Sequence, residues 1–323
     1  MDLKKDNSAT KLFFQRLKSN EVFGILLALI ILLLILSFTS NAFLTSVNLF
    51  NVSRAMSFLA ITAVGQLFVI IAGGIDISVG SIMGLSGVIT ATLVTNNVPV
   101  GFSILGGVLS GLAIGLINSV LIAEVRIPPI IVTLGMLSVV RGLAYFITEG
   151  KPITGLPDNL IALGRGSTLY VPNTVWILIG VGILAYIFLN RTTWGTYIFA
   201  HGHNEQATAF SGINTKKIKY IVYTLSGTLA ALSGVLLTAR LGVSQSTQAT
   251  GYELDVIAAV FIGGATMGGG KGTVLGAIIG AVIMGLVNNG LVLWNISPFL
   301  QEIFIGIVII VAVSIDILRE RRT

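Results

Sequence analysis

The sequence contains no cysteine and few charged residues. Of its 323 residues, 10% are charged, whereas soluble domains average about 25%. Without cysteine, the chain can form no disulfide, thiolate nucleophile or cysteine-based metal site. Hydrophobic residues make up 54% of the chain, and glycine occurs 38 times. This composition is typical of an integral membrane protein whose helices pack closely at glycines.

Patterns that would indicate catalysis or nucleotide binding are also scarce. The two histidines, His201 and His203, form an H-x-H pair, but few carboxylates stand nearby to complete a metal site. The run GGGKGT at 268–273 resembles a P-loop, in which Ser or Thr follows the lysine directly, but Gly272 follows Lys271 here. We therefore expect no active site, and no cofactor or metal bound by this chain. The charges lie between membrane segments, which argues against a nucleic-acid partner.

Hydrophobic runs of about 17–25 residues are each long enough to cross a bilayer. Backbone groups in lipid must be hydrogen-bonded within the protein, and the runs are continuous rather than alternating, so they are expected to be helices. The sequence predicts an all-α integral membrane protein with about ten transmembrane helices, some of them short or broken by glycine. The predicted spans are 23–39, 52–72, 76–95, 101–123, 128–148, 174–190, 217–239, 254–269, 272–293 and 299–317.

The positions of lysine and arginine predict the orientation. Of the 19 such residues, 14 fall in segments that are cytoplasmic if the N-terminus is inside. The other five fall outside or within helices, and they are Arg54, Arg141, Lys151, Arg165 and Arg240. We expect both termini in the cytoplasm. The predicted organisation is a cytoplasmic tail at 1–20, one transmembrane domain at 21–318 and a short cytoplasmic tail at 319–323.

One polar segment, residues 191–219, stands between the hydrophobic runs and contains both histidines. The predicted orientation places it in the cytoplasm. A membrane protein with short loops has little reason to keep such a segment unless a partner docks there. We therefore expect the loop at about 191–216 to bind a cytoplasmic protein. The longest outer loop, 149–173, either meets a soluble partner on the other face or is a constrained connector.

Glycines recur at spacings that affect helix packing. Lines of the form G-x-x-x-G occur at 107–115 and at 276–280, and they are interpreted as packing surfaces within the chain, with contact between two copies as the alternative. Two pairs, Gly73-Gly74 and Gly263-Gly264, are each followed by another glycine at the same G-G-x5-G spacing. This spacing indicates an internal repeat with broken helices, as transport proteins often have. We hypothesise that the segments after these pairs line or gate a transport path.

Polar residues within the predicted spans are few, and buried ones are functional candidates. Asp76 follows the first Gly-Gly pair and either caps the next helix with Ser78 or has a functional role. Arg141 snorkels outward or lines a polar path. The uncharged candidates suit a route for a neutral, hydroxyl-rich solute better than a proton relay, and hydrogen bonds between helices explain them equally well. They are Gln66, Asn118, Thr133, Asn288 and Asn289.

Three motifs, at 73–81, 204–219 and 249–273, resemble the ribose-type permease subunits of bacterial ATP-binding-cassette sugar importers, within the branched-chain amino acid and ribose permease family. The likeness runs from about 43 to 316. It implies a subunit of the bacterial inner membrane that moves a small sugar, ribose or a related monosaccharide. Autoinducer-2 and nucleosides are the alternative substrates, because their permeases are built alike.

The resemblance also implies partners. A separate cytoplasmic ATPase would bind ATP and Mg, and a periplasmic or lipid-anchored protein would deliver the sugar. A second permease copy, identical or related, would complete the pore within the membrane lipid. By this resemblance, the ATPase contacts are Gly202, Asn204, Glu205, Ala207, Ser211 and Gly212. The chain departs from the family's E-A-A…G pattern by having Gln206 where alanine is usual, and it lacks the later Leu-Pro.

The translocation path is expected to involve polar residues within the spans and glycines at the interruptions. These candidates are Gly74, Asp76, Gln66, Asn118, Asn288, Asn289 and Gly264. An ion-coupled secondary sugar transporter is the rival from another class. Such transporters usually need acidic groups embedded in the membrane, and these are sparse here. That rival would also leave the polar docking segment unexplained.

Overall fold

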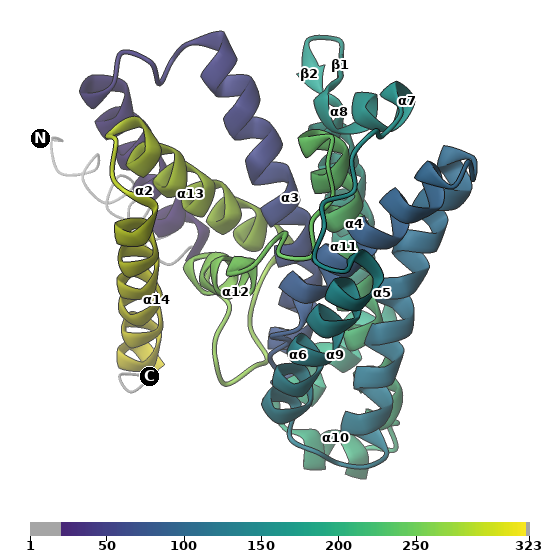
Figure 1. The fold of residues 1–323 in the computed structure, drawn as a ribbon. Helices are drawn as coiled ribbons and strands as arrows, with labels where there is room; N and C mark the ends of the chain where they lie inside the picture. The colour runs from purple at the N-terminus through teal and green to yellow at the C-terminus, as the bar shows by residue number, and fades with distance from the viewer. Residues whose placement is uncertain (1–20, 321–323) are drawn as a thin grey trace, which may run out of the picture.

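Helix α11 packs against α3, α4 and α5 (Figure 1). The computed structural model describes residues 21–320, so the predicted tail at 1–20 and residues 321–323 lie outside the described residues. The helices are α2 (Glu21–Thr39), α3 (Ser46–Ile71), α4 (Val79–Thr95), α5 (Val100–Ala123), α6 (Pro129–Thr148), α7 (Asp158–Arg165), α8 (Asn173–Arg191), α9 (Thr193–His203), α10 (Glu205–Phe210), α11 (Thr215–Leu241), α12 (Tyr252–Ile262), α13 (Val274–Leu293) and α14 (Pro298–Glu320). A single pair of two-residue strands, β1 (Ser167–Thr168) and β2 (Val171–Pro172), is the exception to the all-helical prediction within the described chain.

The inner and outer helices differ in what their apolar side chains touch. Every residue of α3 from Ser57 to Ile71 is buried, so this helix is surrounded by protein. In contrast, α6 and α8 expose large apolar side chains, such as Phe146 and Leu184. Exposed apolar surface of this extent belongs in contact with lipid or another membrane subunit.

Six helices in the described region are long and apolar enough to cross a membrane, namely α3, α5, α6, α8, α11 and α13. Shorter apolar stretches lie in α2, α4 and α14. The predicted extent of the span 254–269 is wrong, because α12 ends at Ile262 after 11 residues. At 1.5 Å per residue this helix is about 16 Å long, roughly half of the ~30 Å hydrocarbon core. The chain leaves the helix at Gly263 and Gly264.

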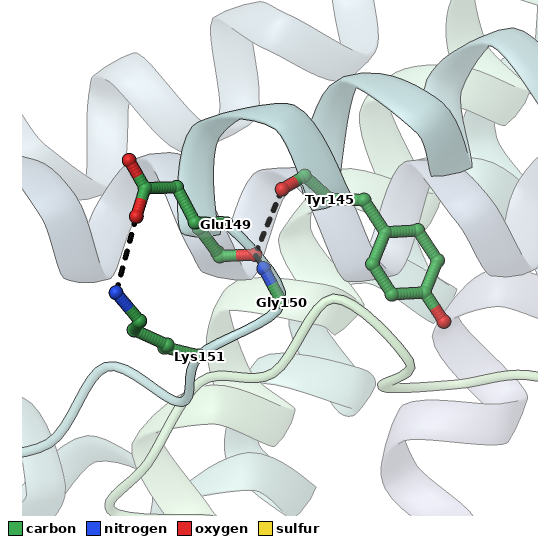
Figure 2. A network of polar contacts seen from close by, with 5 residues as sticks. Tyr145, Glu149, Gly150 and Lys151 are labelled. Atoms are coloured by element: carbon green, nitrogen blue, oxygen red, sulfur yellow. Dashed lines mark hydrogen bonds and ion pairs between the residues drawn. The ribbon is translucent and has the colours of Figure 1, made fainter.

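The two ends of the bundle carry different elements. Helices α9 and α10 lie at one end, and α7 with the β1–β2 hairpin lies at the other (Figure 1). The segment after α6 belongs to the α7 end, where exposed Lys151 and Glu149 form an ion pair of 3.1 Å (Figure 2). Farther along, Ile153 exchanges two backbone hydrogen bonds with Ser244. The loop 149–173 is therefore a partly structured connector tied to the segment after α11.

The glycine lines pack helices within the chain, as the first interpretation predicted. A side chain at Gly111 would collide with the Gly227 carbonyl and Ala231 of α11. A side chain at Gly280 would collide with the Ala259 carbonyl of α12. Small residues thus bring α5 against α11, and α13 against α12.

Candidate functional site

The first interruption, residues 72–78, begins with a glycine turn. Gly73 has φ +80°, and the N–H groups of Gly73 and Gly74 donate to the carbonyls of Ile70 and Val69, each at 2.9 Å. This is the Schellman arrangement that ends many helices. The chain then runs back beside α3 and pairs with the side chain of Gln66. In the amide orientation that satisfies both side-chain atoms, the Gln66 oxygen accepts from the Asp76 N–H at 3.1 Å, and the Gln66 nitrogen donates to the Asp76 carbonyl at 3.2 Å.

The Asp76 carboxylate is completely buried and is held by three hydrogen bonds. Its Oδ1 accepts from the Ser78 N–H at 3.0 Å and from the Ser78 hydroxyl at 2.6 Å. Its Oδ2 accepts from the Ser226 hydroxyl of α11 at 3.0 Å. The Ser78 oxygen also accepts from the Asn118 amide of α5 at 3.0 Å. A buried carboxylate is costly unless it is bonded in this way, so the cluster joins the interruption to α5 and α11.

Some polar atoms of this cluster remain unpaired within the described residues. The Tyr223 hydroxyl and Asn118 Oδ1 are buried without a hydrogen-bond partner. Gly74 makes room for Tyr223, because a side chain at Gly74 would run into the phenol oxygen. The cluster thus combines a satisfied carboxylate with two polar atoms that can still bond a hydroxyl group.

The structure brings together four of the seven residues predicted for the path. Gln66, Asp76 and Asn118 share the cluster, and Gly74 packs against its Tyr223. Asp76 accepts from the Ser78 N–H just before α4, but neither side chain caps the first turn of α4, so the capping interpretation is wrong. Gly264, Asn288 and Asn289 do not belong to this cluster. Whether any of these residues lines a path stays a prediction.

The second interruption, residues 263–273, uses the same turn as the first. Gly264 has φ +85°, and its N–H donates to the Phe261 carbonyl while the Ala265 N–H donates to the Val260 carbonyl. The shared G-G-x5-G spacing pairs Gly263 with Gly73. In the structure, however, Gly264 is the residue with positive φ and corresponds to Gly73. The two turns are therefore alike, but the apparent repeat is shifted by one residue.

Asn288 and Asn289 lie on α13 and have different partners. Asn289 and Asn48 exchange amide hydrogen bonds of 2.9 and 3.2 Å, which join α13 to α3. Asn288 donates to Asp255 Oδ2 of α12 at 3.4 Å. Both asparagines line a cavity of about 230 Å³ between α3, α12 and α13, near Arg240 at the end of α11. Arg141 does not line this cavity, and it donates to the carbonyls of Ser246 and Gln248 in the segment after α11, each at 2.7 Å.

Helices α9 and α10 meet at Asn204, whose side chain caps α10 by accepting from the Ala207 N–H at 2.9 Å. Glu205 forms an ion pair with Lys219 of α11 at 2.7 Å, and its other carboxylate oxygen lies 4.0 Å from His201 Nε2. Glu205 is thus engaged within the chain. The exposed surface of α10 instead presents Phe210, which is 91% exposed.

The remaining predicted contact residues have local roles. The Ser211 hydroxyl donates to the Ala207 carbonyl at the end of α10, and Ala207 itself is exposed. Gly212 follows with φ +81°, which favours glycine. These residues form the turn from α10 into α11, which begins with an Asn214 cap.

Gly202 forms a close backbone junction with both interruptions. A side chain at Gly202 would collide with the Ile71 carbonyl, and it would come within 2.5 Å of the Gly270 nitrogen. The Gly270 N–H donates to the same Ile71 carbonyl at 2.8 Å. Gly269 lies close to both Gly202 and Gly73. The end of α9 therefore touches the segments that follow α3 and α12.

His201 is 4% exposed and packs at the end of α9. Burial lowers the pKa of His201, the Glu205 carboxylate opposes this shift, and Lys219 adds to it. Within the described residues, no group of three histidine, cysteine or acidic side chains is arranged to hold a metal ion.

Sequence reasoning missed several residues that the fold brings to these sites. Tyr223 and Ser226 face Asp76 from α11, which lies 150 residues later, and no local pattern marks them. Phe210 had a usable signal, because a large aromatic residue in a polar segment points to a contact surface. Asp255 carries no local signal beyond being an acidic residue beside a hydrophobic run.

Comparisons with known proteins identify the family of this chain. Residues 48–313 match the family model described as "Branched-chain amino acid transport system / permease component". The ribose import permease protein RbsC of Escherichia coli (strain K12) is 44% identical over 90% of this chain and 92% of its own length. The protein of that name from Bacillus subtilis (strain 168) is 39% identical over 91% and 92%.

An L-arabinose permease protein, AraH of Azospirillum brasilense, is 36% identical over 93% of this chain and 88% of its own length. No solved structure matches the chain. The family model covers most of the sequence, and the relatives align over nearly their full lengths. The chain therefore belongs to the branched-chain amino acid transport system permease family, as one of its ribose-type ATP-binding-cassette permeases.

Proposed function

We propose that this chain is the membrane permease subunit of an ATP-binding-cassette importer for ribose or a closely related monosaccharide. The observation that carries the proposal is the 39–44% identity to ribose import permeases across most of the chain. The arabinose relatives are more distant at 32–36% identity, which favours ribose over other pentoses. Autoinducer-2 and nucleosides are the alternative substrates.

The proposed assembly has a partner at each end of the bundle. A cytoplasmic ATPase, which binds ATP and Mg, docks on α9 and α10, and a periplasmic or lipid-anchored binding protein delivers sugar at the α7 end. A second permease copy stands beside the exposed apolar helices in the bacterial inner membrane. In this arrangement both termini are cytoplasmic, and the chain supplies a path but no ATPase site.

The geometry of α9 and α10 supports a mechanical role for this end. Helix α10 exposes Phe210 as an aromatic anchor for a groove. Its Glu205 is tied to α11 through Lys219, and Lys216 of α11 pairs with Glu124 after α5. A displacement of α10 would therefore move α11 through the ion pair between Glu205 and Lys219. It would also move the two interruptions, because Gly202 of α9 packs against both.

ATP-driven uptake in liposomes tests the proposed function. The permease is reconstituted with its ATPase and binding protein, and uptake of ribose, arabinose, autoinducer-2 and a nucleoside is compared. We expect saturable ribose uptake that requires ATP hydrolysis. Uptake by the permease alone under an ion gradient would identify a secondary transporter and overturn the proposal.

A single substitution tests the docking surface. Phe210→Ala should reduce co-purification of the ATPase at least tenfold, because exposed aromatic anchors carry much of the energy of such interfaces. Tyr170→Ala is a matched control, since Tyr170 is 94% exposed at the opposite end. Equal co-purification of both variants with the ATPase would show that Phe210 is not an anchor.

A further inference from the structure

We infer that the cavity between α3, α12 and α13 binds the transported monosaccharide directly. This inference rests on the proposed function and assigns it a site. The cavity has a volume of about 230 Å³, somewhat smaller than the roughly 300–1,000 Å³ of pockets for drug-sized ligands. Its walls combine apolar side chains with polar ones, and the polar ones are Asn51, Arg240, Tyr252, Asp255, Asn288 and Asn289.

Two oxygens at this cavity are acceptors without a donor. Asp255 is 8% exposed, and its Oδ2 accepts from the Asn288 amide nitrogen at 3.4 Å. In the part of the chain that the structure describes, Asp255 Oδ1 and Asn288 Oδ1 have no hydrogen-bond partner. Buried polar atoms in native proteins are almost always bonded. The two free oxygens therefore call for a ligand with O–H or N–H donors.

Arg240 supplies donors and balances the charge of the cavity. One of its guanidinium nitrogens makes only a long contact of 3.5 Å to the Asn51 carbonyl, and the group lies 5.7 Å from the centre of the Phe58 ring. A cation entering the cavity would meet Arg240, and an anion would meet Asp255. A neutral molecule with several hydroxyls can accept from Arg240 and donate to Asp255 and Asn288. A monosaccharide has this chemistry.

A second cavity lies next to the first, at the α7 end. It has a volume of about 550 Å³ and is bordered by Arg165 and by the segment after α11, including Gln245 and Gln248. Arg240 and Tyr252 line both cavities. These two side chains therefore stand between the larger and the smaller cavity. A sugar that enters from the α7 end would pass the larger cavity first and then reach the smaller one.

Because the chain has no cysteine, an introduced cysteine is its only thiol and can be labelled specifically. Ala55→Cys places a single thiol in the smaller cavity without removing a polar group. The full transporter in proteoliposomes is treated with a membrane-impermeant methanethiosulfonate reagent, with and without ribose. We expect ribose to slow labelling at least fivefold. Lys151→Cys, on the exposed segment after α6, is the control and should react at the same rate in both conditions.

A second substitution identifies the groups that hold the sugar. Asp255→Asn in the Ala55→Cys background should raise the ribose concentration needed for half-protection at least tenfold, because a bond to a charged acceptor is lost. Asn288→Ala should act in the same direction. Glu302→Gln, which neutralises an exposed carboxylate of α14 that lines neither cavity, should change nothing.

The outcomes separate this inference from the proposed function. If the wild-type assembly imports ribose but ribose does not slow labelling of Ala55→Cys, or the thiol never reacts, the cavity is not the sugar site. If ribose protects the thiol while ATP-driven ribose uptake is absent, the binding site stands and the proposed function fails. An unchanged half-protection concentration in both Asp255→Asn and Asn288→Ala would also overturn the assignment.

Discussion

Asp76 and Asp255 are both buried carboxylates, but their oxygens have different surroundings. Asp76 is bonded through both oxygens to Ser78 and Ser226, and it lines neither of the two cavities described above. Asp255 has one oxygen bonded to Asn288 and one without a partner in the described structure, at the wall of a cavity. A satisfied buried carboxylate holds helices together, whereas an unsatisfied one at a cavity is suited to a ligand.

Replacing each carboxylate in turn should separate stability from transport. Asp76→Ala leaves three donors without an acceptor, so we expect the free energy of unfolding to fall by about 2–3 kcal/mol. Asp255→Ala should lower it by less than about 1 kcal/mol, while ribose uptake falls at least tenfold. Thermal unfolding in nanodiscs and uptake in proteoliposomes measure the two effects. Equal losses of stability would remove the distinction between the two carboxylates.

The glycine turns of the two interruptions offer a further comparison. Gly74→Val would place a side chain against the Tyr223 hydroxyl, and Gly264→Val would force a β-branched residue to φ +85°, which costs about 1–2 kcal/mol. Both variants should lower sugar uptake severalfold while the ATPase still co-purifies, because α10 is unchanged. Gly101→Val, at an open helix position, is the control. Normal uptake by Gly74→Val and Gly264→Val would show that the interruptions do not gate the path.

Much of the helical framework could be predicted from the sequence, because continuous apolar runs and glycine spacing are local signals. The helix interruptions at Gly73 and Gly264 could also be predicted, because each falls in a Gly-Gly pair. The predicted extent of α12 was wrong, because the sequence after Ile262 stays uncharged as far as Gly270 although the backbone has left the helix. Ser78 bonds Asp76 from nearby in the sequence, but the other partners, Ser226 for Asp76 and Asn288 for Asp255, lie on α11 and α13 and meet these carboxylates only through the fold. Which carboxylate is satisfied could therefore not be predicted.

His201 is another buried group with an unpaired polar atom in the described region, its Nδ1. Because burial lowers its pKa, the folded state favours neutral His201. This contribution is complete above about pH 6.5 and is lost as the pH falls below the pKa of the unfolded chain. We expect the free energy of unfolding to fall by up to about 1.4 kcal/mol at pH 5.5 relative to pH 7.5.

Two histidine variants test this pH dependence by thermal unfolding at the two pH values. His201→Gln should lose the acid-induced decrease. His203→Gln should keep it, because the His203 side chain is exposed. The same decrease in both variants would assign the effect to other groups.

Tyr223 offers the finest test, because it belongs to the Asp76 cluster but resembles Asp255 in having an unpaired oxygen in the described structure. Tyr223→Phe removes a hydroxyl that bonds nothing, so the free energy of unfolding should change by less than about 0.5 kcal/mol. Ser226→Ala breaks the 3.0 Å bond to Asp76 and should cost about 1 kcal/mol. If Tyr223→Phe also slows uptake without loss of stability, its hydroxyl serves a passing solute, and the Asp76 cluster is part of the path. If Tyr223→Phe is as destabilising as Ser226→Ala, the hydroxyl has a structural partner, and the contrast between satisfied and free oxygens must be redrawn.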